Sequence, residues 1–82
     1  MAHAKRIGSL NCCLGEIKGK NDWLQLFASQ GGWGDGELRL YNVEIYPNGQ
    51  IDYYVDGHKI EYHENCEKLL EYFYSGLVDV IL

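Results

Sequence analysis

The sequence predicts a single small α+β domain spanning residues 1–82, built around a three-stranded antiparallel meander over about 40–63. Three observations predict it: apolar residues alternate with polar ones along the meander, two turns of defined length separate its strands, and apolar residues then recur at helical spacing. The last pattern predicts a packing helix over about 65–75. A short helix over about 21–30 and extra strands at both ends complete the predicted fold.

The segment ahead of the meander has weaker patterns. Residues 5–17 favour a strand through Ile7, Leu10, Cys12 and Leu14. Residues 21–30 favour a short helix that buries Trp23, Leu24, Leu26 and Phe27. Residues 31–36 form a glycine-rich loop around Trp33, which either presents this ring to a partner or folds it back onto the core.

Two turns define the meander. Pro47-Asn48-Gly49 predicts a three-residue hairpin loop with glycine in the left-handed position, and Asp56-Gly57 predicts a two-residue type I′ turn. With these loops, Val43 pairs with Tyr53 and Val55 pairs with His58. Every apolar β-former then falls on one face of the sheet: Tyr41, Val43, Ile45, Ile51, Tyr53, Val55, Ile60 and Tyr62.

The C-terminal segment predicts a helix with Cys66, Leu69, Leu70, Phe73 and Leu77 on one side. Asn65 is the predicted N-cap, Glu64 and Glu67 suit the helix dipole, and Gly76 is the predicted stop. Residues 77–82 are rich in β-branched side chains and favour a fourth strand over a last helical turn.

The same register predicts a row of acids on the face opposite the core. Glu44 lies opposite Asp52, and Asp52 lies opposite Glu61, with Tyr46 and Tyr54 beside the row. Directly opposed like charges destabilise a sheet. We therefore interpret this face as a docking site for a lysine- or arginine-rich surface, in which the acids steer and the tyrosines anchor. The alternative is a solvated face kept acidic for solubility.

Charge indicates the class of partner. The formal net charge is −5, and residues 21–82 carry 11 acids against three bases, a local −8. An acidic body repels nucleic-acid phosphates and anionic lipids, so we expect a basic protein partner, no direct nucleic-acid binding and no membrane binding. No run of about 18 apolar residues predicts a membrane span, and the first ten residues do not resemble a signal peptide. Three cysteines give no disulfide framework, which favours the reducing cytoplasm.

Catalytic and metal motifs are weak. His3, Cys12, Cys13, His58 and the pair His63 and Cys66 are candidate zinc ligands, but they lack the usual spacing, and the acid row lacks a calcium-loop pattern. No cysteine or serine stands in a local motif with an oriented histidine. We therefore predict no cofactor and a protein that is not an enzyme. The alternatives are a homo-oligomerising module, for example a homodimer paired through residues 77–82, or a small zinc-binding domain.

Residues 41–77, above all VEIYPNG and EKLLEYFYSGL, resemble the strand, turn, strand and acidic aromatic helix of small acidic phage anti-CRISPR proteins. The resemblance covers less than half of the chain. In that family, acidic and aromatic surface residues block basic nucleic-acid-binding grooves of defence complexes. The resemblance implies an inhibitor of a bacterial nucleic-acid-binding effector, acting in the host cytoplasm if phage-encoded.

Overall fold

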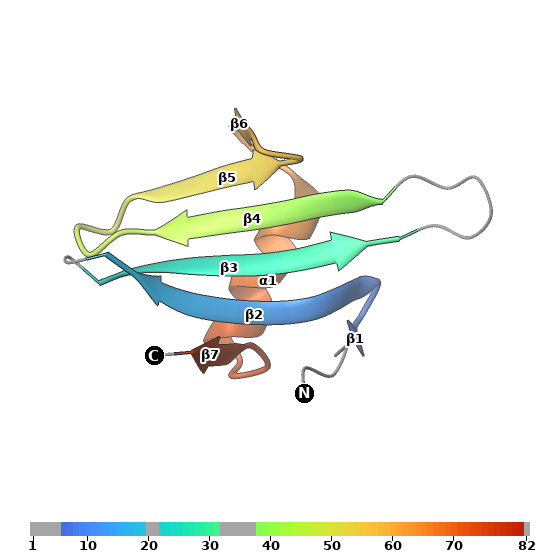
Figure 1. Ribbon diagram of the computed structural model, residues 1–82, viewed down its shortest axis with the longest axis horizontal. Coiled ribbons are helices and arrows are strands. Elements are labelled where there is room, and N and C mark those ends of the chain that lie inside the picture. The colour runs from blue at the N-terminus through green and yellow to red at the C-terminus, as the bar shows by residue number, and fades with distance from the viewer. Residues whose placement is uncertain (1–5, 20–21, 32–37, 82) are drawn as a thin grey trace.

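The computed structural model describes residues 6–19, 22–31 and 38–81, and these form one sheet with a helix on one of its faces (Figure 1). The antiparallel strands run in the order β1-β2-β3-β4-β5-β6, and β7 pairs parallel with β2. The predicted antiparallel sheet with a C-terminal helix is confirmed, and the sheet is larger than predicted. The elements are β1 (Arg6–Ile7), β2 (Leu10–Lys18), β3 (Trp23–Gln30), β4 (Arg39–Ile45), β5 (Ile51–Val55), β6 (His58–Ile60), α1 (Glu64–Tyr74) and β7 (Asp79–Ile81).

The meander register is confirmed. Val43 pairs with Tyr53 and Val55 pairs with His58. Gly49 has φ +93°, as its place in the three-residue loop requires. The third strand is shorter than predicted, because β6 ends at Ile60 and the chain turns away toward the helix. Tyr62 therefore stays 65% exposed.

The helix predicted over about 21–30 is wrong, since this segment is the central strand β3. Leu24, Leu26 and Ala28 face the helix, and the residues between them are half-buried on the other face. Trp23 and Phe27 on that other face stand next to Leu24 and Leu26 in the sequence, so apolar residues occupy consecutive positions and hide the period of two. This run of apolar residues therefore resembled the pattern of a helix, although the segment folds as a strand.

A β-bulge in β2 corrects the prediction for the first strand. The β2–β3 pairing shifts between Asn11 and Leu14, and Cys12 takes φ +59°. The extra residue turns Cys13 into the core at 2% exposure and leaves Cys12 exposed. The predicted strand residues Cys12 and Leu14 therefore do not point into the core.

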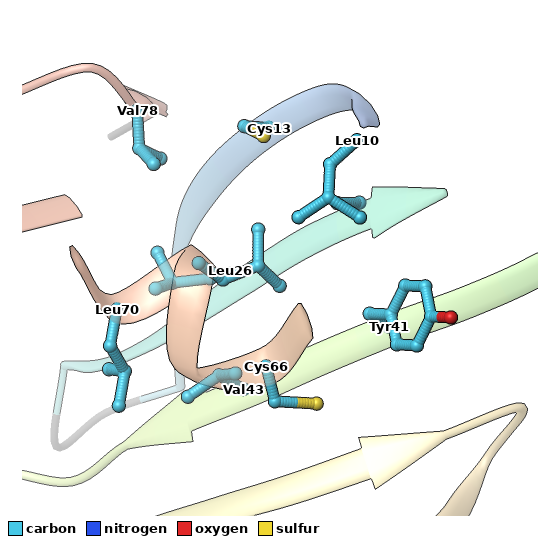
Figure 2. Close-up of a cluster of buried hydrophobic side chains, with 10 residues drawn as sticks. Leu10, Cys13, Leu26, Tyr41, Val43, Cys66, Leu70 and Val78 are labelled. Atoms are coloured by element: carbon cyan, nitrogen blue, oxygen red, sulfur yellow. The ribbon is translucent and has the colours of Figure 1, made fainter. Parts of the chain in front are cut away.

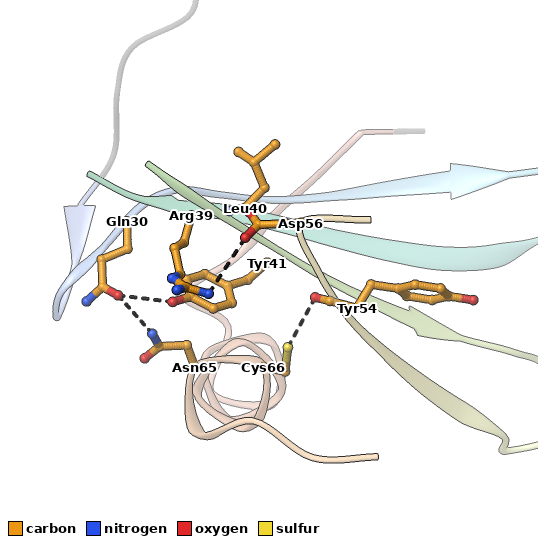
Figure 3. A network of polar contacts seen from close by, with 8 residues as sticks. All are labelled: Gln30, Arg39, Leu40, Tyr41, Tyr54, Asp56, Asn65 and Cys66. Atoms are coloured by element: carbon orange, nitrogen blue, oxygen red, sulfur yellow. Dashed lines mark hydrogen bonds and ion pairs between the residues drawn. The ribbon is translucent and has the colours of Figure 1, made fainter. Parts of the chain in front are cut away.

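Helix α1 matches the prediction in its length but not in its cap. His63 is the N-cap, and its Nδ1 accepts a hydrogen bond from the backbone N–H of Asn65 at 3.1 Å. The predicted cap Asn65 is instead buried, and its side-chain amide donates to Gln30 Oε1, which also accepts from the Tyr41 hydroxyl (Figure 3). Gly76 has φ +80° just past the helix, as predicted for its stop. The tail forms β7, so the strand prediction there is confirmed.

The core lies between α1 and one face of the sheet (Figure 2). Leu26 and Val43 come from the centre of the sheet, and Cys66 and Leu69 come from the helix, all fully buried. The pKa of the Cys66 thiol is raised by its burial, although hydrogen bonds to two strand carbonyls oppose the shift. The helix covers only this face, which leaves the other face of the sheet without a covering element among the described residues. We call that second face the open face.

Candidate docking face

An acidic row crosses the open face at right angles to its strands. The β-sheet register places Glu16 beside Gln25, Gln25 beside Glu44, and Glu44 beside Asp52. These four residues come from β2, β3, β4 and β5 and are all half-buried. We call them the acid row. The row brings together residues that lie up to 36 positions apart in the chain.

Aromatic rings flank the acid row on both sides. Phe27, Asn42 and Tyr54 form the neighbouring row across β3, β4 and β5. On the other side, Trp23 stacks on Tyr46 with ring centroids 6.0 Å apart and planes inclined by 26°. Rings of this kind supply rigid contact area at interfaces with little loss of conformational entropy.

Glu44 is the centre of the acid row. The Tyr46 hydroxyl donates to Glu44 Oε1 at 2.6 Å, and the Gln25 amide donates to Glu44 Oε2 at 3.3 Å. The hydrogen bond to Glu44 is the main reason that the pKa of Tyr46 is raised to about 12. The pKa of Tyr54 is also raised, first by burial and then by the charge of Glu44. The Tyr46 hydroxyl is thus held against Glu44, and the negative charge of Glu44 also contributes to the raised pKa of Tyr54.

The other two acids in the row already have cations. Lys18 Nζ lies 3.4 Å from a Glu16 oxygen, and Lys59 Nζ lies 3.7 Å from an Asp52 oxygen. The Asp52 side chain is only 11% exposed, and it also accepts from the Gln50 amide. Within the described part of the chain, no cation lies within ion-pair distance of Glu44, and its two hydrogen-bond donors there, Gln25 and Tyr46, are neutral.

The structure brings together four of the six predicted site residues: Glu44, Asp52, Tyr46 and Tyr54. Glu61 lies beyond the end of β6, exposed, and it does not pair with Asp52. Lys59 pairs with Tyr54 in the register, and its Nζ reaches diagonally to Asp52. Trp33 lies outside the described residues.

Sequence reasoning missed Glu16, Gln25, Phe27 and Trp23. The latter three lie in the segment that was predicted as a helix, and Glu16 lies beyond the bulge that resets the facing of β2. The available signal was the alternation of Trp23, Gln25, Phe27 and Ser29 with Leu24, Leu26 and Ala28. Read as a strand, this alternation puts a tryptophan and a phenylalanine on the open face.

Two shallow hollows lie on either side of the acid row. One, of about 370 Å³, is lined by Cys12, Phe27, Ser29, Leu40 and Asn42, among others. The other, of about 520 Å³, is lined by Trp23, Tyr46, Pro47 and Asn48. Asn42, which lines the first hollow, and Trp23, which lines the second, each have a buried polar atom without a hydrogen-bond partner in the described structure, Asn42 Oδ1 and Trp23 Nε1.

Two of the candidate zinc ligands have other roles in the structure. His63 caps α1 and Cys66 lies in the core. Across residues 6–19, 22–31 and 38–81, no three His, Cys, Asp or Glu side chains gather in a way that could hold a metal ion. In the same residues, no helix is long and apolar enough to span a membrane.

No protein-family model, curated protein or solved structure matches the chain. The function must therefore be argued from the geometry of the open face.

Proposed function

We propose that this chain is a non-enzymatic protein-binding module whose open face docks on a basic protein surface. The observation that carries the proposal is Glu44, a carboxylate on an uncovered sheet face whose described donors, Tyr46 and Gln25, are all neutral. A lysine or arginine of the partner would supply the missing opposite charge. Hydrogen bonds between ionised groups are about twice as strong as neutral ones.

The surroundings of Glu44 support the same function. Interface hot spots combine aromatic anchors with a charged pair that is sheltered from water. Tyr46 and Tyr54 stand beside Glu44, and Trp23 and Phe27 extend the aromatic area on either side. The net charge of −5 adds long-range attraction to a basic partner, which raises the association rate more than the affinity.

The partner class follows from the charge and from the resemblance to small phage anti-CRISPR proteins. A basic groove that normally holds nucleic acid is a surface that an acidic aromatic face can cover. We therefore propose an inhibitor that occupies the nucleic-acid-binding surface of an effector protein. In this role Glu44 replaces a phosphate charge, and Tyr46 and Tyr54 replace stacked bases.

A homodimer is a second candidate because apolar side chains are exposed at the β7 edge. Leu77, Val80 and Ile81 are 47%, 41% and 52% exposed, next to a strand with one unpaired edge. Edge strands of this kind can pair with a second copy. Sedimentation at low micromolar concentration tests this candidate, and a monomer there would exclude it.

A capture experiment tests the docking function. Tagged protein is incubated with bacterial lysate at low and high salt, and retained proteins are compared between wild type, Glu44→Gln and Glu71→Gln. Glu71 is exposed on α1, so Glu71→Gln removes the same charge from the opposite side of the molecule. We expect a basic protein that is retained by wild type and Glu71→Gln, released by salt, and lost with Glu44→Gln. Equal retention by all three proteins would contradict the proposal.

Alkylation of Cys12 provides an independent test. Cys12 is exposed in the hollow beside Phe27, whereas Cys13 and Cys66 are buried, so a bulky maleimide should react at Cys12 alone in the folded protein. The adduct would fill the hollow and block capture. The Cys12→Ser variant is the control, because reagent treatment should leave its capture unchanged.

A further inference from the structure

We infer that the occupant of the open face is a basic α-helix of the protein partner, laid across β2–β5 along the acid row with an arginine or lysine against Glu44. This inference rests on the docking proposed above and adds the form of the partner. Four observations support it: the spacing of the row, the direction of α1, the flanking rings and the distribution of cations.

The spacing of the row matches a helix better than an extended chain. Glu16, Gln25, Glu44 and Asp52 occupy adjacent strands, which are about 4.8 Å apart in a sheet. One helical turn rises about 5.4 Å, so side chains one turn apart remain close to successive members of the row. Same-face side chains of an extended segment are about 6.8 Å apart and lose the match after one step.

The sheet already accommodates a helix in this direction on its other face. Figure 1 shows α1 behind the sheet, running across the strands, and α1 contacts β2, β3 and β4. The acid row crosses the same three strands and β5 on the open face. A partner helix along the row would place one helix on each face of the sheet.

The rings on both sides of the row suit the side chains of such a helix. Lysine and arginine have long apolar stems that pack on rings while the charged end reaches a carboxylate. Phe27 already attracts a cation, since Lys18 Nζ lies 5.9 Å from its ring centroid.

The distribution of cations places the main contact at Glu44. Lys18 forms an ion pair with Glu16 at one end of the row, and Lys59 forms one with Asp52 at the other end. The middle of the row is therefore its most negative part. A partner helix needs one well-placed cation at its centre, and further cations a turn away gain less because they compete with Lys18 or Lys59.

Synthetic peptides test the helical form directly. Three alanine-rich peptides of identical length carry the same number of arginines. In the aligned peptide the arginines follow i, i+4, i+7 and i+11 on one face, and in the dispersed peptide they are spread around the helix. In the broken peptide a central proline, which costs about 3 kcal/mol in a helix interior, interrupts the aligned pattern. Binding to the full chain is followed by backbone amide NMR at low ionic strength.

We expect the aligned peptide to bind at least about tenfold more tightly than the other two, the effect of one well-placed charge pair. The largest shifts should fall on the amides of the acid row and of Phe27 and Tyr54. Glu44→Gln should weaken the aligned peptide by about tenfold or more, and Glu71→Gln should leave its affinity within about twofold.

Three outcomes would overturn the inference: equal affinities for the three peptides, no binding of the aligned peptide, or shifts confined to α1. Its failure is distinguishable from failure of the docking function. If Glu44→Gln abolishes capture of a basic protein but the peptides show no preference, the docking face stands and the helical partner does not. If Glu44→Gln leaves capture unchanged, the docking face itself is excluded.

Discussion

The two faces of the sheet differ in what their residues do. On the face under α1, Leu26, Val43 and Leu69 are fully buried against one another, and the polar groups there, such as Asn65 and Gln30, bond inward. On the open face, Phe27, Glu44 and Tyr54 are half-buried, and Glu44 accepts a hydrogen bond from Tyr46 along the surface. Alternate residues of the same strands therefore have two roles: one set packs in the core, and the other set forms the uncovered open face. Neighbouring substitutions should separate the two roles.

The largest expected effect comes from the adjacent residues Leu26 and Phe27, which point to opposite faces. Leu26→Ala should lower the free energy of unfolding by about 3 kcal/mol, because it leaves a cavity in the core. Phe27→Ala should cost clearly less stability, since this ring is only half-buried, but it should weaken docking. Urea denaturation measures the first difference, and the capture assay measures the second. Equal destabilisation by the two substitutions would contradict the division between the faces.

The next largest loss of stability should come from disrupting the hydrogen bonds of Asn65 under α1. Asn65 is 5% exposed and donates to Gln30 Oε1 at 3.1 Å (Figure 3). Asn65→Ala should cost about 1–3 kcal/mol, because buried polar groups around it lose a partner. Thermal unfolding followed by circular dichroism measures this loss. The matched control is Asn48→Ala in the exposed hairpin loop, for which the loss should be smaller.

Replacing the N-cap residue of α1 should lower the stability by less, and a second substitution at the same position should restore it. His63→Ala removes the acceptor for the Asn65 N–H and should cost about 1 kcal/mol. His63→Asp should restore most of this stability, since aspartate is a strong N-cap and its charge suits the helix N-terminus. Urea denaturation of the three proteins measures the series. A stability of His63→Asp equal to that of His63→Ala would show that another contact of His63, such as its ring packing on Tyr41, dominates.

The smallest effects concern the two tyrosines whose pKa is raised to about 12. On the open face the main cause for Tyr46 is its hydrogen bond to Glu44, whereas for Tyr53, on the helix side, it is burial, followed by a hydrogen bond to Glu67. Glu44→Gln should therefore lower the pKa of Tyr46 toward its usual value of about 10 and leave Tyr53 unchanged. Glu67→Gln should lower the pKa of Tyr53 only partly. NMR titration of labelled tyrosine rings assigns each pKa.

These raised pKa values also set the direction of an alkaline effect. A tyrosine whose pKa is higher in the folded state than in the unfolded state contributes stability below pH 10. That stability is lost as pH rises from about 10 through about 12. Urea midpoints measured across this window should fall with rising pH, and they should fall less steeply in Glu44→Gln. A flat profile in the wild-type protein would contradict both assignments.

The meander could be predicted because its information is local. Gly49 and Asp56-Gly57 set two loop lengths, and those lengths determine which residues face each other, so Glu44 beside Asp52 followed from the sequence. Helix α1 was also predicted within about one residue at each end. His63 was missed as its cap because Asn65 is the stronger cap former, and the Asn65 side chain instead turns inward to the half-buried Gln30.

The candidate site could be predicted only in part. Glu44, Asp52, Tyr46 and Tyr54 were found, but Glu16, Gln25, Phe27 and Trp23 were not. Segment 23–30 forms a central strand only because β2 and β4 pair on both its sides. Such pairing joins distant parts of the chain and leaves little trace in local sequence. The early end of β6 likewise removed Glu61 from the row, whereas Lys59 keeps its predicted place opposite Tyr54 and its side chain reaches Asp52.

The sequence by itself determined the hairpin register, the acidic body and the C-terminal helix, because turn geometry, charge and helical periodicity act over a few neighbouring residues. The tertiary structure decided which face the helix covers and therefore which side chains remain on the open face. It also decided that Asp52 meets a cation, Lys59, whereas Glu44 meets none among the described residues. The physical reason is that ion pairs and hydrogen bonds form between strands that meet only in the folded sheet.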